Sequence, residues 1–309
     1  MSYVDVGPVR EPKKRHWWVA LILMVLGGTG YLYVGKPKRF ALYFAVTALM
    51  MASIYHGLWG WLADPVVYLS VTAISILVTL GFWADGVRLA VGQSDYELRG
   101  YNRWWIYALC FVAMMFVSSL DEFSFGKIQL GARSYSIPST SMAPNMVLGD
   151  IVIADAKAYR NADPERGDVV VFRLPRDPAI DYTKRVVGLP GERVQMVDGV
   201  LHINGAAVPQ EKVGEVTSTE YGSATRYKET LPGGASHIIQ HVESNQISRN
   251  TQEYVIPENH YFVLGDNRDN SNDSRHQTGV GFVPRENIYA HIGGVIWSKD
   301  WSRMGLRVK

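Results

Sequence analysis

Two serines in this chain have the residue type and the setting for nucleophilic catalysis. Ser139 and Ser141 lie in the segment IPSTSMAPNMVLGD, residues 137–150, where two prolines fix the backbone around both hydroxyls. A serine hydroxyl is a poor nucleophile until a neighbouring base removes its proton. Histidine is the usual base, but the chain has no Gly-x-Ser-x-Gly motif and no histidine in a segment built around a serine. Taken alone, the segment is also typical of an ordinary turn.

Lys184, in the segment DYTKRVVGLPGE of residues 181–192, is a candidate for the base. A lysine among apolar and aromatic neighbours can lose its proton, because burial disfavours the charged form. From a reference pKa of about 10.4, neutralising a lysine at pH 7 costs roughly 4.6 kcal/mol, so a general base needs a depressed pKa. The alternative is a solvated lysine at a strand edge, which describes most lysines.

A third segment, GDNRDNSNDSR of residues 265–275, is dense in glycine, asparagine, aspartate and serine. This composition is what a tight polar turn requires. A turn of this kind can also hold a hydroxyl against a neutral lysine and orient it. The segment is therefore either a plain turn or part of a site that contains Lys184.

Together with RGDVVVF, residues 166–172, these segments resemble the type I signal peptidase family, also called leader peptidases. The likeness covers about residues 136–193 and 261–284, in the order and spacing of that family, and four ordered motifs are more specific than any single one. The resemblance implies a membrane-bound endopeptidase that cleaves signal peptides from exported preproteins. It implies acyl transfer by a serine and a lysine, with no metal or organic cofactor.

The resemblance also implies roles for individual residues. Ser141 matches the nucleophile, and Lys184 matches the general base. Ser139 matches a hydroxyl that forms the oxyanion hole with the backbone N–H of Ser141, and Ser271 matches the serine that orients the lysine. A supporting ion pair and a substrate pocket are implied for Asp273 and Arg275, and for Ile137, Pro138, Met142, Met146, Tyr182 and Thr183.

The chain departs from the family pattern in two places. About three extra residues separate Arg275 from the sequence GFVP at 281–284, and the amino-terminal half has more apolar segments than the family usually carries. Two alternatives therefore stay open: a specialised Ser-Lys peptidase that matures one dedicated substrate, and an inactive membrane scaffold of the same fold. The scaffold is the weaker alternative, because it has no physical need for a desolvated lysine.

The amino-terminal part, residues 1–120, is predicted to be a helical membrane region. Uncharged or nearly uncharged apolar runs at 40–62, 66–83 and 104–120 predict transmembrane helices. A fourth run at 17–34 contains three glycines and is flanked by cations on both sides, so we expect it to enter the membrane and return.

The distribution of cations predicts an orientation for this region. The segment 84–103 holds three arginines, whereas the link 63–65 holds no cation. Because cations favour the cytoplasmic side, residue 40 is expected inside and residue 121 outside. We therefore expect a multi-pass protein of a bacterial-type inner (plasma) membrane, in contact with the lipid bilayer and with its catalytic domain on the extracytoplasmic side.

The remainder, residues 121–309, is predicted to be a mostly β catalytic domain. Short apolar runs alternate with turn signals, and Asp198-Gly199 is a typical hairpin turn. A polar stretch at about 209–253 reads as a long insertion or hairpin with mobile parts. The expected fold is thus a membrane-anchored protein with transmembrane helices followed by a mostly β extracytoplasmic domain.

Composition argues against two other classes of function. The formal net charge is +2 and no block of like charges occurs, so nucleic-acid binding is not expected. The single cysteine, Cys110, excludes both an intramolecular disulfide and a thiolate zinc site. His237 and His241 have the four-residue spacing of a helical metal site but lie in a polar stretch without helical periodicity, so no metal site is predicted.

Overall fold

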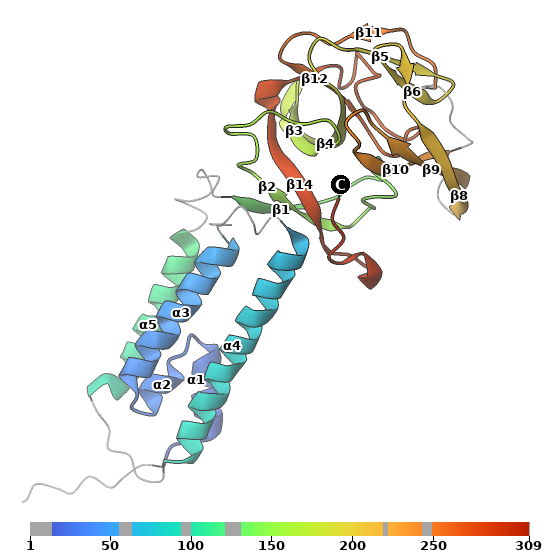
Figure 1. Ribbon diagram of the computed structural model, residues 1–309. Coiled ribbons are helices and arrows are strands. Elements are labelled where there is room, and N and C mark those ends of the chain that lie inside the picture. The colour runs from blue at the N-terminus through green and yellow to red at the C-terminus, as the bar shows by residue number, and fades with distance from the viewer. Residues whose placement is uncertain are drawn as a thin grey trace, which may run out of the picture. The chain divides into compact units, whose positions relative to one another are not determined.

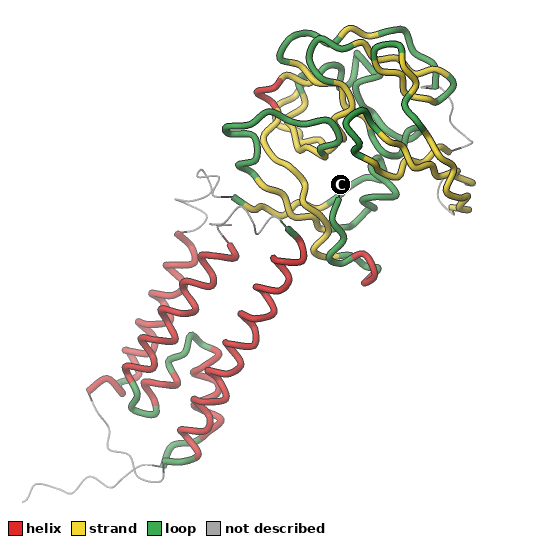
Figure 2. The backbone as a smooth tube through the Cα atoms, viewed as in Figure 1, coloured by secondary structure: helices red, strands yellow, loops and turns green. Residues whose placement is uncertain are grey.

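The computed structural model divides into two compact units (Figures 1 and 2). One unit comprises Met1–His56 and Ser70–Gln129, and the other comprises Gly57–Leu69 and Leu130–Lys309. The second unit therefore includes the first residues of a helix that the sequence places in the membrane region. The structure describes residues 14–55, 64–93, 100–120, 131–218, 222–242 and 249–308.

Helices make up the first unit. Among the described residues, α4 is the one helix with the length and apolar composition to cross a membrane. Apolar side chains along it face outward, with Leu77 67 % exposed. The helices are α1 (Trp17–Val25), α2 (Gly30–Tyr33), α3 (Pro37–Tyr55), α4 (Pro65–Val91), the 3-10 turn η2 (Gly100–Asn102) and α5 (Trp104–Leu120).

The observed helices differ in part from the predicted ranges. α5 has the predicted bounds, and α3 begins at Pro37, while the predicted end of that helix at residues 56–62 lies outside the described residues. α4 continues to Val91 instead of ending at residue 83, so the predicted loop 84–103 is helical in its first part. Within this extension, the Asp85 carboxylate accepts hydrogen bonds from Arg39 Nη1 and the Tyr31 hydroxyl, at 2.5 and 2.9 Å.

The ambiguous run at 17–34 forms two short helices. α1 and α2 are separated at Gly27 and Gly28, whose φ angles of 100° and 73° are left-handed. A nine-residue helix such as α1 is about 14 Å long, less than half of a hydrocarbon core of about 30 Å. A side chain at Gly30 would also overlap the Ala20 carbonyl, because its Cβ would lie 2.5 Å from that oxygen. The re-entrant path of this run stays a prediction.

The second unit is built from antiparallel strands, which confirms the predicted mostly β fold of this part of the chain. A seven-stranded sheet has the order β1-β2-β14-β3-β4-β12-β13, a three-stranded sheet has the order β10-β9-β8, and a four-stranded sheet has the order β11-β5-β6-β7. The strands are β1 (Ala132–Ser136), β2 (Ile151–Asp155), β3 (Val169–Leu174), β4 (Asp177–Gly188), β5 (Arg193–Val197), β6 (Val200–Ile203), β7 (Ala206–Ala207), β8 (Gln210–Ser218), β9 (Gly222–Thr230), β10 (Ser236–Val242), β11 (Tyr254–Val255), β12 (His260–Leu264), β13 (Val283–Pro284) and β14 (Ile288–Trp297).

β4 is the strand that matters most for the site. It lies inside the large sheet between β3 and β12, and Lys184 pairs with Val170 of β3. The strand is exposed at its start and buried from Lys184 onward. This gradient places the lysine where the strand enters the core. A hydrophobic cluster that includes Ile137, Met142 and Met146 packs under the loop after β1 and fixes that loop to the core.

The predicted polar insertion at 209–253 contains the three-stranded sheet β8–β10. Residues 219–221 and 243–248 of this stretch lie outside the described residues. His237 and His241 are on strand β10, so their spacing is not that of a helical metal site.

Candidate active site

Ser141 and Lys184 lie next to each other in the second unit. Lys184 Nζ donates hydrogen bonds to Ser141 Oγ and to the Thr183 carbonyl, both at 2.9 Å. The serine comes from the loop after β1 and the lysine from β4. They are 9 % and 3 % exposed. The sequence therefore predicted a pair of side chains that the fold brings into direct contact.

Burial determines the protonation of this lysine. It lowers the pKa of Lys184 from 10.5 to about 8, while Asp273 and Asp266 raise the pKa and Arg275 lowers it through charge. About one lysine in ten is then neutral at pH 7, compared with about three in ten thousand at the ordinary pKa. A neutral amine within hydrogen-bond distance can take the proton of the Ser141 hydroxyl.

Ser139 lies beside the nucleophile. Its Oγ is 3.1 Å from Ser141 Oγ. No described residue accepts a hydrogen bond from the Ser141 backbone N–H. Two donors, the Ser139 hydroxyl and this N–H, are therefore close to the atom that would attack a carbonyl, as an oxyanion hole requires.

A cleft of about 660 Å³ opens at the dyad. Of the predicted pocket residues, Ile137, Pro138, Met142, Tyr182 and Thr183 line it. Met146 does not, because its side chain is 0 % exposed within the hydrophobic core. Lining residues that the sequence reasoning did not name include Tyr135, Leu148, Val171, Ile180 and Asn270.

The polar turn after β12 contains the predicted ion pair. Arg275 donates from Nε and Nη2 to the two carboxylate oxygens of Asp273, both at 2.8 Å, and both side chains are buried. Burial alone would raise the pKa of Asp273, but the charge and hydrogen bonds of Arg275 lower it below its ordinary value. Asp273 also accepts from the Gly265 N–H at 3.1 Å. The pair therefore holds the turn closed.

Ser271 does not make the contact that the family resemblance implies. Its Oγ is buried and makes no hydrogen bond to Lys184; its hydroxyl instead helps to lower the pKa of the Asp273 carboxylate. Thr183, not Ser271, supplies the second partner of Lys184. Ser271 packs instead against Gly265, where an added Cβ would lie 2.2 Å from Ser271 Oγ and 2.5 Å from the Ser141 carbonyl oxygen. Only glycine fits at that position.

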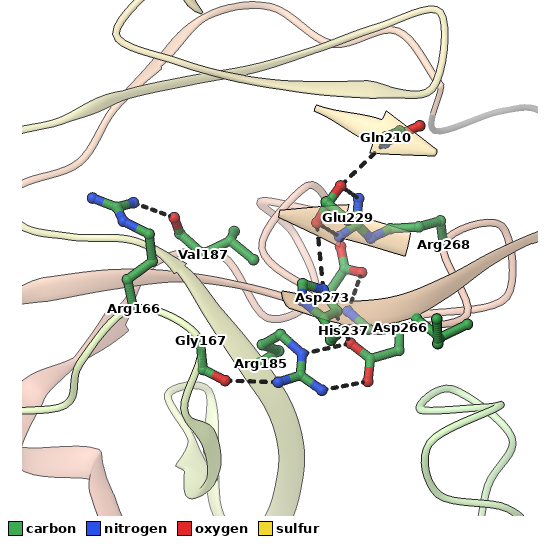
Figure 3. Close-up of polar contacts among 12 residues, drawn as sticks. Arg166, Gly167, Arg185, Val187, Gln210, Glu229, His237, Asp266, Arg268 and Asp273 are labelled. Atoms are coloured by element: carbon green, nitrogen blue, oxygen red, sulfur yellow. Dashed lines mark hydrogen bonds and ion pairs between the residues drawn. The ribbon is translucent and has the colours of Figure 1, made fainter. Parts of the chain in front are cut away.

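A buried network of charges begins at the residue after Lys184 and was missed by the sequence reasoning; Figure 3 shows its members. Arg185, next to Lys184, donates to both carboxylate oxygens of Asp266 at 2.8 and 2.9 Å and to the Gly167 carbonyl at 2.7 Å. In the sequence, the only signs of this ion pair were a second cation beside the candidate base and an aspartate in the polar turn. Pairing over 81 residues could not be assigned from that.

The three-stranded insertion sheet contributes the other half of the network. Glu229 on β9 accepts two hydrogen bonds from Arg268 of the polar turn. His237 on β10 has its Nε2 3.4 Å from Glu229 and 3.8 Å from Asp266. Burial lowers the pKa of His237, and the charge of Arg185 lowers it further, so this histidine is neutral near pH 7. Among the described residues, no cluster of three or more potential metal ligands occurs.

A mostly β domain with a buried lysine bonded to a serine at an open cleft defines a serine peptidase that uses lysine as its base. Comparison with known proteins agrees. The family model described as signal peptidase, peptidase S26, matches residues 103–297. The chain belongs to this signal peptidase family, whose members are serine endopeptidases, and this confirms the resemblance drawn from the sequence.

Individual relatives are similar over different parts of their length. A signal peptidase I from Pseudomonas aeruginosa is 41 % identical over 174 residues, which cover 50 % of this chain and 61 % of the relative. One from Rickettsia akari is 32 % identical over 226 residues, covering 64 % of this chain and 80 % of the relative. A crystal structure of a signal peptidase I from Enterococcus faecalis matches with 30 % identity and a TM-score of 0.25, covering 42 % of this chain and 97 % of that one.

Proposed function

We propose that the chain is a membrane-bound endopeptidase that removes signal peptides from exported preproteins. The observation that carries the proposal is the 2.9 Å contact between Lys184 Nζ and Ser141 Oγ at the edge of the cleft. Family membership supports the substrate class. The cleft gives a peptide segment access to a nucleophile that is otherwise almost buried.

The proposed reaction is acyl transfer. Neutral Lys184 takes the hydroxyl proton as Ser141 Oγ attacks the scissile carbonyl, and the carbonyl electron pair becomes an oxyanion. The Ser139 hydroxyl and the Ser141 N–H stabilise that oxyanion. The lysine then gives its proton to the departing amine. Water, deprotonated by the same lysine, attacks the acyl-enzyme, and the lysine gives this proton to Ser141 Oγ as the acyl group leaves.

The membrane arrangement is part of the proposal. We propose that residues 1–120 form the membrane region and residues 121–309 the extracytoplasmic catalytic domain, with α3, α4 and α5 crossing the bilayer. With 19, 27 and 17 residues, these helices are about 28, 40 and 26 Å long, lengths suited to a core of about 30 Å. The cations flanking 17–34 favour a cytoplasmic position for both of its ends. Three crossings then put the catalytic domain outside.

The decisive experiment is cleavage of a preprotein by the purified full chain in detergent. Sequencing the new amino terminus of the product tests the position of the cut. Ser141→Ala and Lys184→Met should each abolish cleavage, because nucleophile and base act as a unit. Lys228→Met is the matched control, since Lys228 is an exposed lysine on β9, and it should cleave like the wild type. Substantial turnover by purified Ser141→Ala would end the assignment.

A further inference from the structure

Asn267, in the polar turn after β12, contacts the backbone on both sides of the nucleophile. Its N–H donates to the Ser141 carbonyl at 3.0 Å, and its side-chain Nδ2 donates to the Thr140 carbonyl at 3.1 Å. The residue is 0 % exposed. One residue therefore holds the peptide unit that precedes Ser141 and the peptide unit that follows it.

The bond to the Thr140 carbonyl has a consequence for the oxyanion hole. The carbonyl of Thr140 and the N–H of Ser141 belong to the same peptide unit, which is planar and trans, so the two groups point in opposite directions. Holding the carbonyl from the side of the turn aims the N–H away from the turn. No described residue accepts from that N–H, so it is available to a bound substrate.

The side chain of Asn267 acts through its nitrogen alone. Its Oδ1 is buried and has no hydrogen-bond partner among the described residues. Rotating the amide by half a turn would place this oxygen against the Thr140 carbonyl, and two acceptors cannot bond each other. The arrangement therefore leaves one buried oxygen unsatisfied in order to direct an N–H donor at the Thr140 carbonyl.

Asn267 is itself fixed relative to the base. Its neighbour Asp266 is bonded through both carboxylate oxygens to Arg185, the residue after Lys184. The dipeptide 266–267 thus connects the strand that carries the lysine with the loop that carries the serine. A second asparagine, Asn270, donates to Thr140 as well, but to its side-chain Oγ1 at 2.9 Å, so this bond does not act on the peptide unit itself.

We propose that Asn267 is a positioning residue that sets the direction of the Ser141 N–H and so completes the oxyanion hole. The proposal rests on the proposed Ser-Lys peptidase function. The Ala143 N–H also donates to the Thr140 carbonyl, at 3.0 Å, so loss of Asn267 should misdirect the donor without removing it.

The test replaces Asn267 by leucine, which has a similar shape and no hydrogen-bonding group. Complete loss of one oxyanion donor lowers kcat by about 10²–10³-fold, so partial misdirection should lower kcat by roughly ten- to a hundredfold with KM within about twofold. Asn287→Leu is the matched control, because it removes an amide bond of 2.9 Å to the Arg173 carbonyl. It should leave kcat unchanged.

A pair of inhibitors separates positioning from general loosening. A peptide aldehyde accepts Ser141 Oγ at its carbonyl carbon, and the carbonyl electron pair becomes the oxyanion while Lys184 takes the proton. The matching peptide alcohol binds without this step. Asn267→Leu should weaken the aldehyde by the same factor as kcat and leave the affinity for the alcohol unchanged.

Equal weakening of both inhibitors, or a kcat within twofold of wild type, would overturn the role of Asn267. Asn267→Ala gives the same test if thermal unfolding shows that the leucine variant does not fold. These outcomes are separate from failure of the peptidase function itself, because the latter appears as an inactive wild type or an active Ser141→Ala.

Discussion

The rate of cleavage should depend on pH through Lys184. Only the neutral amine can accept the serine proton, so kcat/KM should rise as this group loses its proton. Burial lowers the pKa of the lysine to about 8. We therefore expect kcat/KM to increase from pH 6 to pH 8 and to level off above that value.

The size of the effect follows from the shift. With a pKa of about 8, the neutral fraction is about one in a hundred at pH 6 and about one in ten at pH 7, so each pH unit changes the rate about tenfold. A lysine at its ordinary value would still be climbing at pH 10. The pKa of Lys184 is about two and a half pH units below the ordinary lysine value. This shift corresponds to about 3 kcal/mol of free energy in favour of the neutral amine, contributed mainly by desolvation.

The assay is kcat/KM of the full chain in detergent, measured on a peptide or preprotein substrate between pH 6 and pH 10. This parameter reports the ionisation of the free enzyme. A variant of His237 is the control, because His237 is a buried histidine within the charge network that includes Asp266. The pH profile of this variant should keep the same rising limb as wild type. A rising limb near pH 6.5 that disappears in a histidine variant would contradict a lysine base, as would a limb that continues without a plateau to pH 10.

Further predictions concern rate, specificity, stability and topology. Ser139→Ala should lose roughly 10²–10³ in kcat, as expected for one oxyanion donor, in the same assay. Preproteins should be cleaved after alanine and not after leucine or phenylalanine at the residue before the scissile bond, and product sequencing checks this. At pH 7 the free energy of unfolding of Lys184→Met should exceed that of wild type by up to about 3 kcal/mol, and denaturant unfolding measures this difference. The pKa of Lys184 in the folded state lies below its unfolded value of about 10.4, so wild type loses stability as pH falls from 10.4 to 8. The stability advantage of Lys184→Met over wild type should therefore vanish near pH 10. With Cys110→Ser, an impermeant thiol reagent on intact cells should label Ser124→Cys and not Ser2→Cys; labelling of both would contradict the re-entrant segment.

The dyad could be found from sequence because its signals are local. The residues around Ser141 and Lys184 lie in short segments that, taken alone, are also typical of a turn and of a strand edge, but the order of these segments along the chain matches a family. The strand character of β4 was not predicted, because its sequence, DPAIDYTKRVVG, has no regular alternation of apolar and polar residues. The sequence could therefore identify the two residues of the dyad, and the fold then brings their side chains into contact.

Other features depend on long-range packing and were out of reach. Met146 follows the same local pattern as Met142, but the loop turns its side chain into the core instead of the cleft. The Asp85 side chain on α4 is paired with Arg39 on α3, a contact between helices that the sequence does not reveal. The polar insertion carried no local signal that Glu229 would be buried behind the site.

The charges around Lys184 explain how it can be both buried and basic enough to act. Asp273 and Asp266 would each stabilise the ammonium form, and both raise the pKa of the lysine. Each is bonded through both oxygens to an arginine, Arg275 and Arg185. Buried ion pairs of this kind add little net stability over apolar packing, so their more important effect here is electrostatic. The charge of Arg275 lowers the pKa of the lysine and so works against the two carboxylates. Desolvation is the largest influence, and it favours the neutral amine that the proposed reaction requires.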